Sequence, residues 1–350
     1  MTGRWTKRDL NRTLLARQHL LERTTMPAVE MVGHLVGLQA QENLPPYLSL
    51  AARLDPFDPH ELSGALERGE AVRLLTMRGT IHVLTPDDAL ALRPWVQPAL
   101  DQQSKSNQLN RAARHVPVAD LVAEARRLLA AGPLPVKELG ERLAEAFPDA
   151  PAGALAHVAR ERAPLVQLPP RGLWRASGGV VYQTVENHLG RPTTEVDVRE
   201  LVRRYLRAFG PATAADMTVW SRVTRLGPVF AAMRDELEVV ETEDGRRLYD
   251  VPAAPVVDGS APAPVRLLGA YDNVWLSHAD RSRIMADEAR ARWMGSNGGV
   301  GRTVFVDGFL TGLWWWRDGG VELDLFRTLA RAERSELDDE VDRVTALLAD

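Results

Sequence analysis

Two glutamines separated by a single alanine, Gln39-Ala40-Gln41, are the side chains best placed to do chemistry together. A helix is expected over residues 27–39, with Thr25 as its cap, and it must end before Pro45-Pro46, because the residue before a proline is driven out of the α region. Positions i and i+2 of a helix point about 200° apart. If the helix ends near Gln39, an extended step brings both amides to one side, where two donor-acceptor groups converge. The alternative is that Gln39 caps a helix end and Gln41 faces solvent.

Other catalytic constellations are weak in this sequence. The eight histidines show no i, i+4 pair with an acid between them, and cysteine is absent, so we expect no metal site and no cofactor. The absence of cysteine also excludes disulfides and a thiol nucleophile. The glycine-rich segment 295–301 lacks a following Lys-Ser/Thr and a strand-to-helix context, so we expect a mobile loop and not a phosphate-binding one. No Gly-x-Ser-x-Gly elbow occurs.

A weak internal repeat indicates which elements position the glutamines. Helix, Gly-Pro, helix, helix and hairpin follow one another in residues 118–190 and again in 194–252. Three short amphipathic helices and a two-stranded hairpin are marginal alone but share one small core, which is the plan of a winged helix. The predicted elements are helices over 118–131, 136–147 and 152–162 with strands 165–168 and 173–175, then helices ending at 209, over 212–219 and over 227–237 with strands 237–242 and 247–249.

The ends of the chain complete the plan. Residues 1–104 fit it more loosely, with helices over 8–21, 27–39 and 59–68 and a hairpin of 71–77 and 80–85 that turns at Arg78-Gly79. A Pro/Ala linker over 252–264 precedes residues 265–350, in which two Asp-Gly turns predict two hairpins before a helix over 331–348. We expect a mainly α fold with small β-hairpins (α+β): three tandem winged-helix units and a C-terminal β-containing domain.

Composition restricts the protein class. A chain of 350 residues is too long for one ordinary core. No apolar run approaches the roughly 20 residues of a membrane span, and the start lacks the apolar stretch of a secretory signal, so we expect a cytoplasmic monomer that does not bind membranes. The net charge of −4 means that any nucleic-acid affinity must come from a local basic face.

Three strings together carry a resemblance to a known family: Gly37-Leu38-Gln39-Ala40-Gln41, Leu75-Thr76-Met77-Arg78-Gly79-Thr80-Ile81-His82, and Tyr271-Asp272-Asn273-Val274-Trp275-Leu276-Ser277-His278-Ala279-Asp280-Arg281. With these strings, the chain resembles the winged-helix DNA glycosylases of the AlkZ and YcaQ type over nearly its whole length. The resemblance implies three winged helices and a C-terminal domain in a C shape around DNA. It also implies that Gln39 and Gln41 are the catalytic Gln-x-Gln pair of the AlkZ-like branch, since the YcaQ-like branch has aspartate at the second position.

The chemistry of alkylated purines suits two neutral amides. A purine alkylated at N7 is positively charged and leaves easily, so the sugar develops oxocarbenium character without strong acid catalysis. The protein must then hold a water below the anomeric carbon and stabilise positive charge, which amide oxygens do by orientation and electrostatics. No lysine is well placed as a nucleophile for strand cleavage, so we expect a monofunctional enzyme acting on double-stranded DNA that contains alkylated purines.

Two groups of residues are candidate DNA contacts. Arg78, Thr80 and His82 lie on the first predicted hairpin, where a wing meets a phosphate; packing within the turn is the alternative. His278, Arg281 and Arg283 are candidates to clamp the DNA backbone, with internal ion pairing to Asp280 as the alternative. Consecutive tryptophans at 314–316 alternate between two faces of a strand and are expected to pack in the core.

Two other functions remain open from the sequence. Winged helices usually regulate transcription by placing a helix in the major groove, although three units in one chain argue against the usual dimer. A structural protein that stacks the repeat without binding nucleic acid is the third alternative. If the protein is a glycosylase, the sequence leaves open whether it removes N7-alkylguanine, N3-alkyladenine or bulky natural-product adducts. The resemblance also implies a role in antibiotic self-resistance, since family members encoded near antibiotic clusters act in this way.

Overall fold

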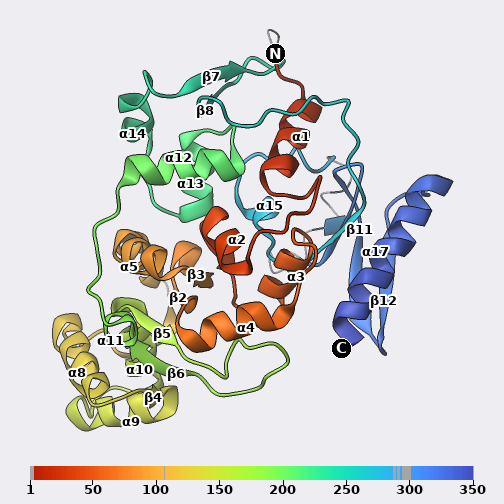
Figure 1. The fold of residues 1–350 in the computed structure, drawn as a ribbon. Helices are drawn as coiled ribbons and strands as arrows, with labels where there is room; N and C mark the ends of the chain where they lie inside the picture. Colours follow the sequence, from red (N-terminus) through yellow and green to blue (C-terminus); the bar gives the residue numbers. More distant parts are fainter. Residues whose placement is uncertain (1–3, 106, 287–288, 290–291, 294–300, 350) are drawn as a thin grey trace.

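The computed structural model describes the chain except residues 1–3, 106, 287–288, 290–291, 294–300 and 350. The glycine-rich segment 295–301, expected to be a mobile loop, therefore lies almost entirely outside the described residues. Figure 1 shows helices distributed around small sheets, with β11, β12 and α17 at one side of the molecule and α8, α9 and α10 at the other. The fold is mixed α+β, as expected.

The first half of the chain alternates helices with short strands. Its elements, in order, are α1 (Lys7–Arg17), α2 (Ala28–His34), β1 (Leu38–Gln39), α3 (Pro45–Ala51), α4 (Pro59–Arg68), β2 (Val72–Leu75), the 3₁₀ turn η1 (Met77–Gly79), β3 (Ile81–Leu84), α5 (Pro86–Trp95), α6 (Gln97–Ser104), α7 (Gln108–Ala112), α8 (Val118–Ala130), β4 (Leu134–Pro135), α9 (Val136–Ala146), α10 (Ala152–Arg162), β5 (Leu165–Gln167), β6 (Val181–Thr184) and α11 (Val185–Leu189). Local signals explain several bounds: Asp58 caps α4, whose first residue is Pro59, and Gly69 ends it in the left-handed region.

The second half begins with helices and ends with a sheet followed by a long helix. Its elements are α12 (Val198–Phe209), α13 (Ala214–Ser221), α14 (Gly227–Ala232), β7 (Glu238–Glu241), β8 (Arg247–Asp250), β9 (Arg266–Leu268), α15 (Asn273–Leu276), β10 (Thr303–Val306), β11 (Phe309–Arg317), β12 (Gly320–Leu325) and α17 (Arg331–Ala349). The Asp307-Gly308 and Asp318-Gly319 turns join β10 to β11 and β11 to β12, as predicted. Trp314 is buried, Trp316 partly buried and Trp315 exposed, so the alternation is confirmed, but the expectation of core packing is wrong for Trp315.

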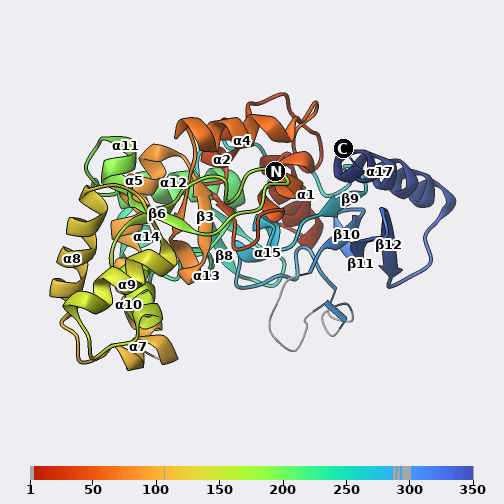
Figure 2. The same cartoon turned by 90° about the horizontal axis from the view of Figure 1, so that it is seen from below.

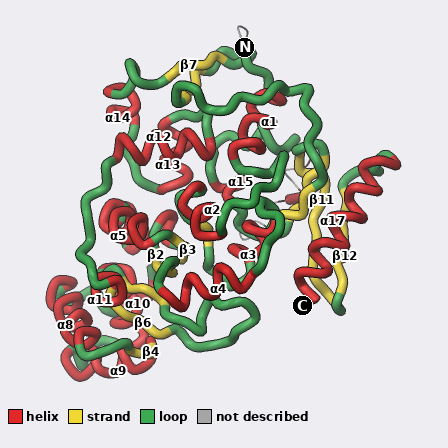
Figure 3. The backbone as a smooth tube through the Cα atoms, in the orientation of Figure 1, coloured by secondary structure: helices red, strands yellow, loops and turns green. Residues whose placement is uncertain are grey.

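The first two predicted hairpins are not separate, because they form one sheet. Its strand order is β1-β3-β2-β5-β6-β4, and β2 pairs with β5 in antiparallel register, Arg73 opposite Gln167 and Leu74 opposite Val166. The other two sheets join β7 with β8 and β12-β11-β10-β9. Figure 1 shows β2 and β3 next to β5 and β6, with α8, α9 and α10 below them, and Figure 3 shows the same strands as short segments among helices. The hairpins of the N-terminal and middle segments therefore hold each other in place.

The helix predicted over residues 27–39 is wrong at its C-terminal end. α2 stops at His34, and Val36 and Gly37 both adopt left-handed backbone, with φ of 52° and 100°. A side chain on Gly37 would place its Cβ 2.4 Å from a methyl of Leu84, so only glycine fits there. The chain leaves this turn extended, which makes Gln39 part of strand β1 and not the end of a helix.

Three other expectations require correction. Residues 173–175 form no strand, because the chain from 168 to 180 crosses to the first segment, where Trp174 packs on Tyr47 with ring centroids 5.0 Å apart; the strand is β6 instead. The Pro/Ala segment 252–264 is not a free linker, since its backbone carbonyls accept hydrogen bonds from arginines of α1. Two helices are also shorter than predicted: α1 ends at Arg17, and α14 ends at Ala232.

Buried apolar residues of the described chain form one large core and three smaller ones, the smallest of which consists of Trp5, Leu10 and Leu248. The large core combines the first segment, the α12–α14 region and part of the C-terminal domain, with Leu14, Tyr205 and Trp275 all below 1% exposed. The middle segment, residues 113–182, has a core of its own, and α17 packs with the C-terminal sheet around a third. The middle segment thus has apolar packing of its own, although its Val166 and the adjoining Val185 belong to the large core.

A buried ion pair joins the C-terminal domain to the first segment. Arg53, at the end of α3, donates from both terminal nitrogens to the two carboxylate oxygens of Asp272, each at 2.8 Å, and neither side chain is exposed. Ser49 and Gln18 complete the network. The next residue, Asn273, donates from Nδ2 to the carbonyl of Gly37 at 2.8 Å. The network therefore fixes the turn that leads into Gln39.

Removing the charge of Asp272 should destabilise the whole fold. Asp272→Asn leaves the Arg53 guanidinium buried without a counter-ion, which costs about 3 to 5 kcal/mol of the free energy of unfolding. Asp324→Asn, in the half-exposed pair with Arg292, is the matched control and should cost less than about 1 kcal/mol. Urea denaturation measures both. Equal losses in the two variants would show that the buried pair is not what joins the domain to the first segment.

Candidate active site

Strand β1 places both glutamines against the turn between β2 and β3. Gln39 pairs with His82 across the sheet, and the amide of Ala40 donates to the carbonyl of Ile81 at 2.7 Å. Gln39 is buried, at 7% exposed, and Gln41 is exposed. Both side-chain amides contact the stretch from Arg78 to Ile81. Both amides therefore contact the same turn, and they do so from an extended chain and not from a helix end.

The partners of the two amides fix which way each amide faces. The Oε1 of Gln39 accepts a hydrogen bond from Nη2 of Arg78 at 3.0 Å, and the Oε1 of Gln41 accepts one from the backbone N–H of Ile81 at 3.2 Å. A guanidinium and a backbone N–H only donate, so each amide must present its oxygen to them. Each oxygen keeps a second lone pair. No described residue hydrogen-bonds either Nε2 group, so both remain available to a ligand.

Arg78 is held inside the protein by a strained turn. Its backbone is left-handed, with φ of 58°, which non-glycine residues rarely adopt. The guanidinium donates to Gln39, to Nε2 of His82 at 2.9 Å and to the carbonyl of Trp220. Burial, together with the charge of Arg222, lowers the pKa of Arg78 to about 9. These three hydrogen bonds place Arg78 in the packing of the turn, which was the alternative to a phosphate contact.

His82 is neutral and takes a single tautomer. Its Nδ1 lies 3.0 Å from the carbonyl oxygen of Thr80, which can only accept, so the ring proton is on Nδ1 and Nε2 accepts from Arg78. Burial, reinforced by the charge of Arg78, lowers the pKa of His82 well below its ordinary value. The hydroxyl of Thr80 donates to the carbonyl of Met77 and closes the turn. Arg78, Thr80 and His82 are thus brought together, but as support for Gln39.

The second group of predicted DNA contacts lies largely inside the molecule. His278 is 2% exposed, and its Nε2 donates to the carbonyl of Phe209 at 2.9 Å. Arg283 is 4% exposed and donates to the carbonyl of Pro211 at 3.0 Å. Side chains so deeply buried have no surface to offer a phosphate, so the interpretation of His278 and Arg283 as a clamp gives way to an internal role. They join the C-terminal domain to the turn after α12.

Asp280 forms its ion pair outside the segment that carries Arg281. Arg281 is half-buried; its Nε donates to the carbonyl of Trp275 at 2.8 Å, and its guanidinium lies 5.5 Å from the ring centroid of Trp293. Asp280 pairs with Arg246 of β8. The expected ion pair within the segment is therefore replaced by one to another element.

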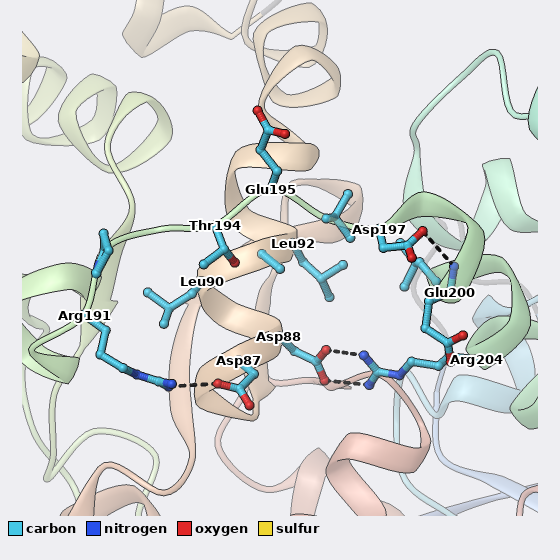
Figure 4. A pocket seen from close by; sticks show the side chains of 14 residues that line it. Asp87, Asp88, Leu90, Leu92, Arg191, Thr194, Glu195, Asp197, Glu200 and Arg204 are labelled. Atoms are coloured by element: carbon cyan, nitrogen blue, oxygen red, sulfur yellow. Dashed lines mark hydrogen bonds and ion pairs between the residues drawn. The ribbon is translucent and has the colours of Figure 1, made fainter.

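A cavity of about 480 Å³ between α5, residues 190–197 and α12 is unsuited to phosphate. In Figure 4, Asp87 pairs with Arg191 at 2.9 Å, and Asp88 pairs with Arg204 through both carboxylate oxygens. The remaining charged side chains that line it are carboxylates, at positions 195, 197 and 200. Acids outnumber bases here, so this wall of the protein repels a polyanion.

Among the residues that the structure describes, no cluster of three or more histidine, cysteine, aspartate or glutamate side chains is arranged to hold a metal ion. In the same residues, no helix combines the length and the apolar character needed to cross a membrane. The sequence analysis missed the contact between Arg78 and Gln39, because the two are far apart along the chain and no local signal marks a turn side chain that folds back onto a neighbouring strand.

The sequence and the fold of this chain are both similar to those of known DNA glycosylases. Residues 32–347 match the family described as DNA glycosylase AlkZ-like. The chain belongs to this family. One AlkZ-like relative, the interstrand DNA cross-link repair glycosylase of Streptomyces sahachiroi, is 26% identical over 325 residues, covering 86% of this chain and 85% of the relative. The solved structure of Streptomyces sahachiroi DNA glycosylase AlkZ has a similar fold, with a TM-score of 0.80 and 23% identity over 98% of both chains. The expected family is confirmed, and with it a DNA substrate.

The protonation of His82 can be tested directly. Its ring should remain neutral, with the proton on Nδ1, at one pH unit below the usual histidine pKa of about 6.5. Because the unfolded chain binds this proton and the folded chain does not, the free energy of unfolding should fall as the pH drops below about 6.5. Nitrogen-15 NMR of selectively labelled histidine, assigned with His82→Asn, measures the ring state. A charged His82 ring in the folded protein at that pH would contradict the hydrogen bond from Arg78.

Proposed function

We propose that this chain hydrolyses the N-glycosidic bond of alkylated purines in double-stranded DNA and that Gln39 and Gln41 are its catalytic pair. The candidate substrates are N7-alkylguanine, N3-alkyladenine and bulky natural-product adducts. The description of the Streptomyces sahachiroi relative adds interstrand cross-links to this range. The observation that carries the proposal is the pair of amides anchored side by side on the Arg78–Ile81 turn, each with an unused lone pair and an unused Nε2 group.

The groups of the site suit a leaving group that needs no protonation by the protein. The side chains that contact the two glutamines include no carboxylate, since Gln39 bonds Arg78 and Gln41 bonds a backbone amide. His82 is neutral, so the site has no evident general acid. An alkylated purine that already carries positive charge needs no general acid, because the electron pair of the glycosidic bond is drawn into the purine ring as that bond breaks.

We propose that a water donates one hydrogen to each amide oxygen and directs its own lone pair at the anomeric carbon. The bond from C1′ to the purine nitrogen breaks, and its electron pair neutralises the purine. The water oxygen bonds to C1′ and loses a proton to solvent. The two amides contribute orientation and the negative ends of their dipoles, which stabilise the oxocarbenium ion.

The recurring order of helices and hairpins suggests how the chain is divided into units. We infer three winged-helix units over residues 1–104, 118–190 and 194–252, followed by a C-terminal domain over 265–350, that together curve around DNA. The recurring order of helices followed by a hairpin supports this division, and β2 pairing with β5 supports a fixed angle between the first two units. No lysine approaches the glutamines among their described contacts, which supports a monofunctional enzyme.

Base release separates this function from a regulatory one. Incubation with duplexes that contain a single N7-alkylguanine or N3-alkyladenine should release the free base and leave an intact strand that breaks only after alkali. The measurement is mass spectrometry of the soluble base beside denaturing electrophoresis of the strand. Tight binding without base release across a panel of small, bulky and cross-linked adducts would favour a DNA-binding regulator. Strand cleavage without alkali would contradict the monofunctional assignment.

Arg78 should act by positioning Gln39. Arg78→Ala frees the amide of Gln39 and should slow single-turnover excision at saturating enzyme by about 100-fold, since small misplacements of a catalytic group cost this much. Arg78→Lys keeps a charge but cannot serve three acceptors from one planar group, so it should recover little activity. DNA affinity and its salt dependence should stay close to wild type in both variants. If Arg78 instead contacted phosphate, the slope of log affinity against log salt would fall by about 1.

A further inference from the structure

The turn that joins α13 to α14 presents two arginines to solvent. Arg222 and Arg225 are both exposed, and both have left-handed backbone, with φ of 66° and 64°. This region favours glycine, and a larger residue there is strained. Thr224, between them, is exposed as well. Two long cationic side chains thus occupy backbone positions where glycine would be more stable.

A polar cavity separates this turn from α6. It has a volume of about 890 Å³ and is lined by the 222–225 turn on one side and by Gln102 and Gln103 of α6 on the other, with Trp95 also at its wall. The cavity adjoins the Arg78–Ile81 turn, called the catalytic turn below. Gln103 lies against Gly79 of this turn, and Arg78 donates to the carbonyl of Trp220 at the end of α13. A ligand in this cavity would lie beside the turn that holds Gln39 and Gln41.

Positive charge continues from the cavity along α6 and α7. Lys105 donates from Nζ to Gln102 at 3.1 Å, and a second cavity of about 420 Å³ is lined by Lys105, Arg111 and Arg114. All three side chains are exposed. α7 and α13 lie on the same side of the molecule, the lower side in Figure 2. We call Lys105, Arg111, Arg114, Arg222 and Arg225 the basic stripe.

The charges of the basic stripe are not neutralised within the described part of the chain. None of its five residues forms an ion pair with a described carboxylate, whereas arginines of the neighbouring helix α12 are paired, for example Arg203 with Glu236 and Arg204 with Asp88. The positive charge of Arg222 also contributes to the lowered pKa of Arg78. In a protein with a net charge of −4, the stripe is a local positive surface that attracts a polyanion.

We propose that the basic stripe binds consecutive phosphates of the DNA strand that carries the target base and leads that strand across the catalytic turn. This inference rests on the proposed function for the nature of the target base. Its phosphate contacts come from the 222–225 turn and from α6–α7, two parts of the chain that flank η1. The basic stripe thus takes the role of phosphate contact that the sequence had suggested for His278 and Arg283, which are buried.

The double variant Arg222→Gly/Arg225→Gly tests the proposal without harming the fold. Glycine relieves the left-handed backbone, which offsets the extra freedom that it gives the unfolded chain, so the unfolding temperature should not fall. Binding of an undamaged duplex is measured by fluorescence anisotropy between 50 and 200 mM salt, the range over which phosphate contacts are resolved. The slope of log affinity against log salt should decrease in magnitude by about 0.9 for each contact, hence by about 1.8 for the pair.

The matched control is Arg331→Ala/Arg334→Ala, which removes the same charge from exposed positions of α17 amid acidic residues. Its slope should equal that of wild type. An unchanged slope in the glycine variant, or equal changes in the two variants, would overturn the proposal. Because the duplex is undamaged, this binding measurement does not depend on catalysis. A stripe that contributes to binding in a protein that releases no base from any alkylated duplex would refute the glycosylase proposal and leave the stripe proposal intact.

Discussion

The left-handed turn at Val36 and Gly37 is the constraint on which the site depends. It ends α2 before the glutamines and sends the chain into β1, which converts an i, i+2 spacing that diverges on a helix into one that converges. Leu84 of β3 leaves no room for a side chain on Gly37. Asn273 of the C-terminal domain holds the carbonyl of Gly37 from outside. Segments at both ends of the chain thus cooperate to keep two amides in one place.

Arg78 extends this constraint to the third segment. Its guanidinium bonds Gln39, His82 and the carbonyl of Trp220, so a residue of the first hairpin is tied to the end of α13. The basic stripe begins at that same end, where Arg222 closes the helix. DNA held there would therefore contact the element that also supports the catalytic amide. In the arrangement that we propose, phosphate binding and catalysis share a support, whereas the excess of carboxylates in the cavity beside α5 repels a polyanion.

Much of the fold follows from local signals, and most of the corrections follow from packing. The Asp-Gly turns and the cap of α4 at Asp58 specify their elements with a few neighbouring residues, so they are predictable. Residues 173–175 have the composition of a strand, but Trp174 finds a better environment against Tyr47 of the first segment. His278 looks like a surface contact because its burial depends on α12, which is distant in sequence. The resemblance to the family draws attention to the glutamines, but neither it nor their spacing reveals the contact of Gln39 with Arg78.

The coupling between Gln39 and Gln41 tests the central claim most directly. If both amides orient one water, Gln39→Ala and Gln41→Ala should each slow single-turnover excision of an N7-alkylguanine about as much as the double variant does, with DNA affinity nearly unchanged. The measurement is the excision rate at saturating enzyme for wild type, both single variants and the double variant. Rate losses that simply add would mean that the two amides act independently. Wild-type rates in both single variants, on a lesion that the protein excises, would show that the amide pair is structural and that the catalytic residues lie elsewhere.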